Sequence, residues 1–116
     1  MTEVSSEVKQ ANDLTVLQQE LKDNPDDIGS YTRLGWALYS LQKFDEAAST
    51  FKSAFERWPA DIETNYGLGM AFKMQGDKQE ALESFKRAES PEPESVRASM
   101  MQTLAVEQKA YLLQKV

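Results

Sequence analysis

The stretch "YTRLGWALYSLQKFDEAASTFKSAFERWP", residues 31–59, decides the fold. In its first half, Tyr31, Leu34 and Leu38 recur at three- and four-residue spacing, which predicts one apolar face of a helix. Gly35 lies beside that face, and glycine lowers helix propensity. A glycine is usually tolerated inside a helix where another helix approaches closely. This half therefore predicts a helix packed against a near neighbour.

The second half of the stretch also has an apolar helical face, but its side chains alternate in size. Ala47, Phe51 and Ala54 place a small, a large and a small residue along one helical face. Pro59 ends the segment, because proline disfavours helix in the residue before it. The stretch therefore predicts two short helices folded against each other as a hairpin.

The hairpin recurs further along the chain. A shift of 34 residues brings ten identical residues into register, whereas ordinary composition gives about two by chance. The matched pairs are Ile28/Ile62, Leu34/Leu68, Gly35/Gly69, Ala37/Ala71, Glu46/Glu80, Ala47/Ala81, Phe51/Phe85, Lys52/Lys86, Ala54/Ala88 and Pro59/Pro93. Caps support the helix starts, since Asp61 precedes one helix and Asp77 with Glu80 has capping-box spacing.

This pattern resembles the tetratricopeptide repeat family, whose motif is a bulky residue, Leu-Gly, a large apolar residue, alanine, an aromatic, alanine and proline. The first copy fills these slots with Tyr31, Leu34, Gly35, Leu38, Ala47, Phe51, Ala54 and Pro59, and the second with Asn65, Leu68, Gly69, Phe72, Ala81, Phe85, Ala88 and Pro93. Only Asn65 departs from the motif. The resemblance implies an all-α, right-handed α-solenoid in which the first helix of each repeat lines a concave groove and the second forms the outer wall.

The flanks extend the array within a single domain, residues 1–116. We expect repeats at 28–61 and 62–95, an N-terminal capping helix over 5–22 and a C-terminal capping helix over 96–115. Leu14, Leu17 and Leu21 are spaced like the second helix of a preceding repeat. Gln102 and Thr103 replace Leu-Gly in the last helix, which fits a terminal cap, since an end repeat lacks one neighbour.

The groove predicted from the resemblance would be lined by aromatic, methionine and a few polar side chains. Its candidate residues are Thr32, Trp36, Tyr39, Tyr66, Met70, Lys73, Met100, Leu104 and Tyr111. Aromatics and methionine are enriched in interface cores, so this face favours an extended or helical peptide. The alternative is that Trp36 and Tyr66 pack on each other or on the terminal helix. Phe44, Phe51, Phe55, Phe72 and Phe85 are assigned to the core, and Trp58 to a structural lid.

The terminal helix carries two apolar stripes. Val96, Met100, Leu104 and Tyr111 form one, and Ala98, Met101, Ala105 and Leu112 the other, roughly 120° away at 100° per residue. The alanine-containing stripe suits docking on the second repeat, and the bulkier stripe would border the groove or pair with another chain. A single wide contact that buries both stripes is the alternative.

These features predict a non-enzymatic protein-protein interaction module or scaffold. The alternative is a homo-oligomeric structural protein that self-associates through the same apolar surface and the C-terminal helix. The net charge of −6 mildly favours a basic partner by electrostatic steering. Co-chaperones of this family hold a C-terminal carboxylate with several basic residues, but Arg97 is the single basic candidate on the last helix, so that role is not expected.

Composition excludes other classes. The chain has no cysteine and no histidine, which removes thiol chemistry, zinc-cysteine sites and the commonest general base. Acidic "KDNPDDIG", residues 22–29, lacks the ligand pattern of a calcium loop. We expect no catalysis, metal or cofactor. No basic cluster suggests nucleic-acid binding, and no signal peptide or membrane-spanning run is seen. A cytoplasmic location is the default expectation.

Overall fold

The computed structural model describes the backbone of residues 6–114, and side chains from residue 13 onward. This part of the chain forms six helices and no strand. They are α1 (Ser6–Asp23), α2 (Ile28–Ser40), α3 (Phe44–Arg57), α4 (Ile62–Gln75), α5 (Lys78–Glu89) and α6 (Val96–Gln114). The capping helices were expected over 5–22 and 96–115. Residue 5, the expected start of the first, and residue 115, the expected end of the second, lie outside the described residues.

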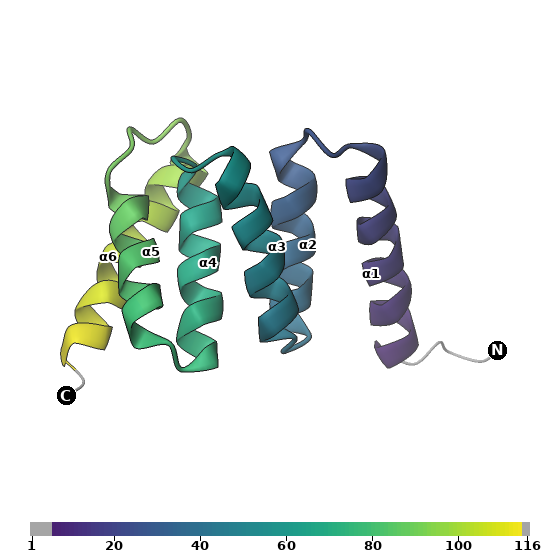
Figure 1. Ribbon diagram of the computed structural model, residues 1–116, viewed down its shortest axis with the longest axis horizontal. Helices are drawn as coiled ribbons and strands as arrows, with labels where there is room; N and C mark the ends of the chain where they lie inside the picture. Colours follow the sequence, from purple (N-terminus) through teal and green to yellow (C-terminus); the bar gives the residue numbers. More distant parts are fainter. Residues whose placement is uncertain (1–5, 115–116) are drawn as a thin grey trace.

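The helices stack side by side along the longest dimension of a 50 × 33 × 24 Å molecule, with α1 and α6 at opposite ends (Figure 1). Each helix packs against the next one along the chain. In addition, α2 contacts α4 and α4 contacts α6, so these three helices form one continuous layer. The expectation of an all-helical repeat solenoid is confirmed.

Phe51 joins the first hairpin to the second. Its ring is fully buried, and a Cβ atom added to Gly35 would lie 2.7 Å from the ring carbon Cζ. An added Cβ on Gly67, in the next repeat, would overlap the same ring. Phe85 repeats the first of these contacts, since a Cβ on Gly69 would lie 2.6 Å from its Cε1. The glycine of each Leu-Gly pair therefore leaves room for a phenylalanine ring, which a Cβ atom would overlap.

The first turn of each of the three layer helices, α2, α4 and α6, is capped by a side-chain oxygen that accepts a hydrogen bond from a backbone N–H. Asp27 accepts from the backbone N–H of Gly29 at 3.3 Å. Asp61, 34 residues later, accepts from the N–H of Thr64 at 2.9 Å, which confirms its predicted capping role. Ser95, a further 34 residues on, accepts from the N–H of Ala98 at 3.0 Å. The repeat register therefore continues into α6.

Asn65 is the one departure from the family motif in the second copy, and its surroundings explain it. The side chain is fully buried. Its Nδ2 donates to the carbonyl oxygens of Pro59 at 2.9 Å and Asp61 at 3.0 Å, while Oδ1 accepts from Nε of Arg87 at 3.1 Å. Tyr31, in the same slot of the first copy, donates to the carbonyl of Pro25 at 3.0 Å. Both side chains therefore bind the proline carbonyl six residues upstream.

Gln102 replaces the motif leucine in α6 because it ends α5. Its Nε2 lies within hydrogen-bond distance of the carbonyl oxygens of Ala88 (3.1 Å), Glu89 (3.1 Å) and Pro91 (2.8 Å). The last carbonyls of a helix have no partner within the helix. A side-chain amide from α6 therefore satisfies the end of α5 and holds the connection that follows it.

Restoring the family residue with Gln102→Leu is expected to lower the free energy of unfolding by about 1–2 kcal/mol, since buried carbonyls lose their donor. Urea denaturation followed by circular dichroism measures this. Gln114→Leu, at an exposed position of the same helix, is the control and should stay within about 0.5 kcal/mol of the wild type. A stabilised Gln102→Leu variant would contradict the assigned role.

Candidate partner-binding surface

The predicted groove residues come from α2, α4 and α6, which the fold places in one layer. Trp36 and Tyr39 of α2 meet edge to face, with ring centroids 5.7 Å apart. Tyr66 of α4 lies 5.8 Å from Trp36. Lys73, also on α4, reaches α6 and donates to Oε1 of Gln108 at 2.7 Å. The layer therefore links side chains from three helices into one continuous surface.

Two of the predicted groove residues are buried. Thr32 is 7% exposed, and its hydroxyl donates to the carbonyl of Gly29 at 3.2 Å. Tyr66 is 9% exposed and packs between Trp36 and Phe85, whose ring centroid is 6.1 Å away. Neighbouring side chains therefore cover both residues, and their assignment to a partner-binding groove stays a prediction.

Trp36 holds the two repeats together while keeping part of its ring at the surface. The indole is half-buried and packs edge to face on Phe51 at 5.0 Å, as well as against Tyr66. Its Nε1 donates to Oε2 of Glu63 at 2.9 Å. The sequence left open the alternative that Trp36 packs on Tyr66, and the structure shows this contact. Trp36 therefore lies at the base of the surface, where only part of its ring is exposed.

Glu63, in the first turn of α4, links α4 to both α2 and α6. Besides Trp36, its carboxylate accepts from Nη2 of Arg97 at 2.9 Å and from Nε at 3.4 Å. The hydrogen bond and charge of Glu63 raise the pKa of Arg97 above its usual value. The cation considered for a carboxylate clamp is therefore already paired within the chain.

Tyr39 of α2 and Met70 and Lys73 of α4 are half-buried, and α4 contacts both α2 and α6. The ammonium of Lys73 lies 5.0 Å from the ring centroid of Tyr111, a cation–π contact. Tyr111 is 45% exposed and Leu104 39% exposed, and their seven-residue spacing puts them on the same side of α6. We call the surface formed by Tyr39, Met70, Lys73, Leu104 and Tyr111 the first-helix face.

The phenol groups of this region are neutral hydrogen-bonding groups. Burial raises the pKa of the Tyr39 hydroxyl above its ordinary value. Burial, followed by electrostatic interaction with Tyr39 and Glu107, raises the pKa of Tyr66. Both hydroxyls therefore stay protonated at neutral pH, and a ligand at this surface meets phenol groups, one ammonium and one carboxylate.

The two stripes of α6 have different environments. Ala105 and Leu112 are buried against α4 and α5, with Ala98 and Met101 partly buried beside them. The bulkier stripe is left exposed, with Met100 at 61%. A single contact that buries both stripes is therefore wrong.

A third apolar group on α6 was missed by the sequence reasoning. Val106 is 47% exposed and Leu113 is 60% exposed. At 100° per residue they lie on the opposite flank of the buried stripe from Leu104 and Tyr111. Their seven-residue spacing was the signal that would have identified them.

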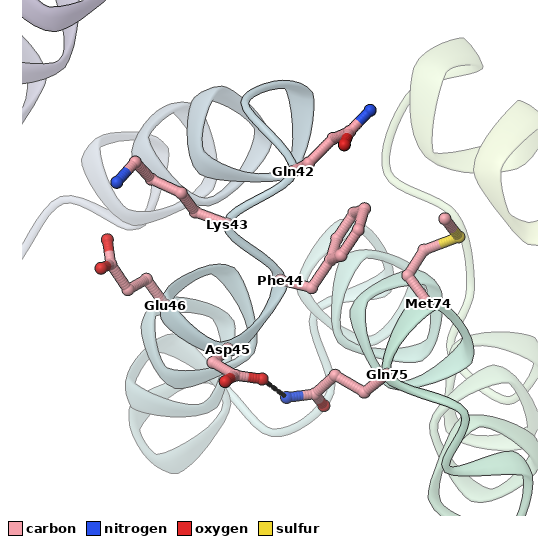
Figure 2. Close-up of a pocket in the computed structure, with 7 residues that line it drawn as sticks. All are labelled: Gln42, Lys43, Phe44, Asp45, Glu46, Met74 and Gln75. Carbon is pink, nitrogen blue, oxygen red and sulfur yellow. Dashed lines mark hydrogen bonds between the residues drawn. The ribbon is translucent and has the colours of Figure 1, made fainter.

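The hollow drawn in Figure 2 lies away from the first-helix face. It has a volume of about 390 Å³ and is formed where the α2–α3 turn meets the end of α4. Asp45 accepts a hydrogen bond from Nε2 of Gln75 at 2.6 Å across its lower edge, while Phe44 and Met74 point over the opening. Phe44 packs against Tyr39, with ring centroids 5.3 Å apart, and so supports one residue of the first-helix face.

The described residues contain no group of three or more acidic side chains placed to hold a metal ion. A helix long and apolar enough to cross a bilayer is also lacking among them.

Comparisons with known proteins agree with a helical repeat fold. A tetratricopeptide repeat model matches residues 32–101. No curated protein matches the chain. Solved structures that resemble it include MamA from MSR-1, with 25% identity and a TM-score of 0.64 over 93% of this chain and 62% of that one. The MamA D159K mutant shares 27% identity with a TM-score of 0.61, covering 89% of this chain and 57% of that one.

MamA 41-end from Desulfovibrio magneticus RS-1 has 19% identity and a TM-score of 0.65, over 91% of this chain and 66% of that one. At this identity the match shows a similar fold only. The chain thus spans less than two thirds of the length of these MamA structures. Tetratricopeptide repeats are in general non-enzymatic modules that bind protein partners, and these matches support a protein-interaction scaffold. The chain belongs to the tetratricopeptide repeat family.

Proposed function

We propose that the chain is a scaffold that binds an extended or helical peptide of a partner protein on the first-helix face. The observation that carries this proposal is the contact of Lys73 with Gln108 and Tyr111, which joins α4, the helix that also carries half-buried Met70, to the exposed flank of α6. Exposed aromatic and methionine side chains with a polar margin are typical of interface cores. Glu107 and the net charge of −6 favour a basic partner.

In this proposal the chain is one unit with two full repeats, residues 28–61 and 62–95. Helix α1 takes the place of the second helix of a preceding repeat, and α6 that of the first helix of a following repeat. Support comes from the capping residues Asp27, Asp61 and Ser95, which keep one register. A cytoplasmic location stays a prediction from composition.

The test is a double substitution of the exposed flank, Leu104→Ser with Tyr111→Ser. Because this removes apolar contact area outside the core, partner binding should weaken at least about tenfold. Thermal unfolding should shift by only a few degrees, since Tyr111 loses its cation–π contact with Lys73, worth about 0.5–1 kcal/mol at an exposed site. Recovery of partners from the source cell, followed by binding measurements on the purified partner, provides the readout.

Val106→Ser with Leu113→Ser is the matched control, because it removes similar exposed residues from the opposite flank. Equal weakening by both pairs would point to a general effect of α6. Undiminished binding by the first pair would refute the first-helix face as the binding surface.

Self-association is the second candidate, and the exposure of α6 favours it. Of the eight most exposed large hydrophobic residues in the described chain, six lie on α6: Val96, Met100, Leu104, Val106, Tyr111 and Leu113. A capping repeat normally needs a polar outer face. Sedimentation equilibrium at tens of micromolar decides between the candidates, since a monomer contradicts self-association and leaves the first-helix face free for a partner.

A further inference from the structure

A cavity lies at the end of the molecule where the α3–α4 and α5–α6 connections meet, the upper end in Figure 1. Its volume of about 610 Å³ falls within the roughly 300–1,000 Å³ of small-ligand pockets. One wall is apolar and is formed by Ile28, Trp58, Pro59 and Ile62. The opposite wall comes from the α5–α6 connection and the first turn of α6. No residue of the first-helix face lines this cavity.

The equivalent place one repeat earlier, between the α1–α2 and α3–α4 connections, explains why space is left here. There, Arg57 spans the gap between connections, donating to the carbonyl of Pro25 and to the carboxylate of Asp26. The residue 34 positions after Arg57 is Pro91, which has no side chain that can span the gap. Residues 90–95 form a connection of six residues, compared with four at 58–61. The cavity therefore lies where no side chain equivalent to Arg57 joins the two connections.

The charges around the cavity are unbalanced. Arg57 is paired with Asp26 and Arg97 with Glu63, while Asp61 is occupied in capping α4. Among the described residues, Glu92 and Glu94 have neither a hydrogen bond nor an ion pair, although both line the cavity. The opening therefore combines an apolar wall with two uncompensated carboxylates.

We propose that this cavity binds an extended peptide segment of another protein through an arginine or lysine next to an aliphatic residue. The cation pairs with Glu92 and Glu94, and the aliphatic side chain packs on the wall that contains Trp58 and Ile62. Charge complementarity selects this occupant, because the paired arginines leave no free cation to hold an acidic one. The site is separate from the first-helix face and goes beyond the proposed function.

The test uses a fluorescein-labelled peptide, GLRLRG with a C-terminal amide, in fluorescence anisotropy titrations with the full chain at 50 mM salt. Glu92→Gln with Glu94→Gln is expected to weaken binding roughly two- to thirtyfold, the range for two exposed ion pairs. Salt should reproduce part of this loss, since exposed charges are screened. Thermal unfolding should not change, because both glutamates are exposed.

Two further variants locate the peptide. Ala60→Trp at the exposed rim fills the cavity without altering charge and should abolish binding. Glu46→Gln with Glu83→Gln removes the same charge from exposed positions outside the cavity and should leave binding within about twofold of the wild type. Equal loss in this control pair, or full binding by Ala60→Trp, overturns the proposal.

The outcome also separates this proposal from the first-helix face. Loss of peptide binding in Leu104→Ser with Tyr111→Ser, but not in Glu92→Gln with Glu94→Gln, would place the peptide on the first-helix face and overturn the cavity proposal. A wild-type chain that does not bind the peptide at 1 mM protein, about the weakest affinity of practical use, also overturns it and leaves the first-helix face untouched.

Discussion

Phe51→Ala is expected to lower the free energy of unfolding by about 3–5 kcal/mol, the usual cost of deleting a fully buried aromatic ring. The ring is 0% exposed and lies between Gly35 and Gly67. Neither glycine has a side chain to move into the space, so the cavity stays open. Because small domains have only about 5–15 kcal/mol of stability, the variant should lose a large share of it and unfold at a clearly lower temperature than the wild type. Guanidinium denaturation followed by circular dichroism measures the loss.

Phe44→Ala provides the comparison for Phe51→Ala. Phe44 is half-buried at the rim of a hollow and is therefore expected to cost less than half as much. If the two variants lost the same stability, the placement of Phe51 as the packing centre between the repeats would be incorrect.

Asn65→Leu is expected to destabilise the chain by about 2–4 kcal/mol, although leucine is closer to what the family prefers in this slot. The substitution removes the donor to the carbonyls of Pro59 and Asp61 and the acceptor for Arg87. A buried polar group left without a partner costs about 1–3 kcal/mol, and a charged one more. The measurement is the midpoint and slope of urea unfolding.

Tyr31→Phe is the matched control, because it removes one hydrogen bond to Pro25 from the same slot of the first repeat. Its expected cost is about 0.5–1.5 kcal/mol. An Asn65→Leu variant as stable as the wild type would mean that hydrophobic burial compensates for the lost polar contacts, contrary to the assigned role.

The sequence predicted the hairpins well because their signals are local. Helical spacing around Leu34 and Phe51, the proline ends and the Asp61 cap depend on residues within one or two turns. The repeat of 34 residues then extended these local signals along the chain. Gly67 was missed because its role comes from the preceding repeat, whose Phe51 ring lies against it.

The surface was harder to predict than the core. Helical spacing put Tyr66 and Trp36 on the same side of the layer, but it could not decide between an open groove and the packing of the two rings on each other. Likewise, Gln102 could be recognised as a departure from the motif, whereas its purpose depends on the three carbonyl oxygens at the end of α5. Contacts between elements, rather than properties of one element, decided these positions.

The position of Phe51 between two glycines also bears on how the array bends. Two bare stretches of backbone, one from each repeat, lie close against a single rigid ring. Any change of the angle between the repeats must tilt or slide that ring within a close-packed interior, which resists compression. The curvature presented to a partner is thus set in advance, and the array should flex least at the junction of α3 and α4.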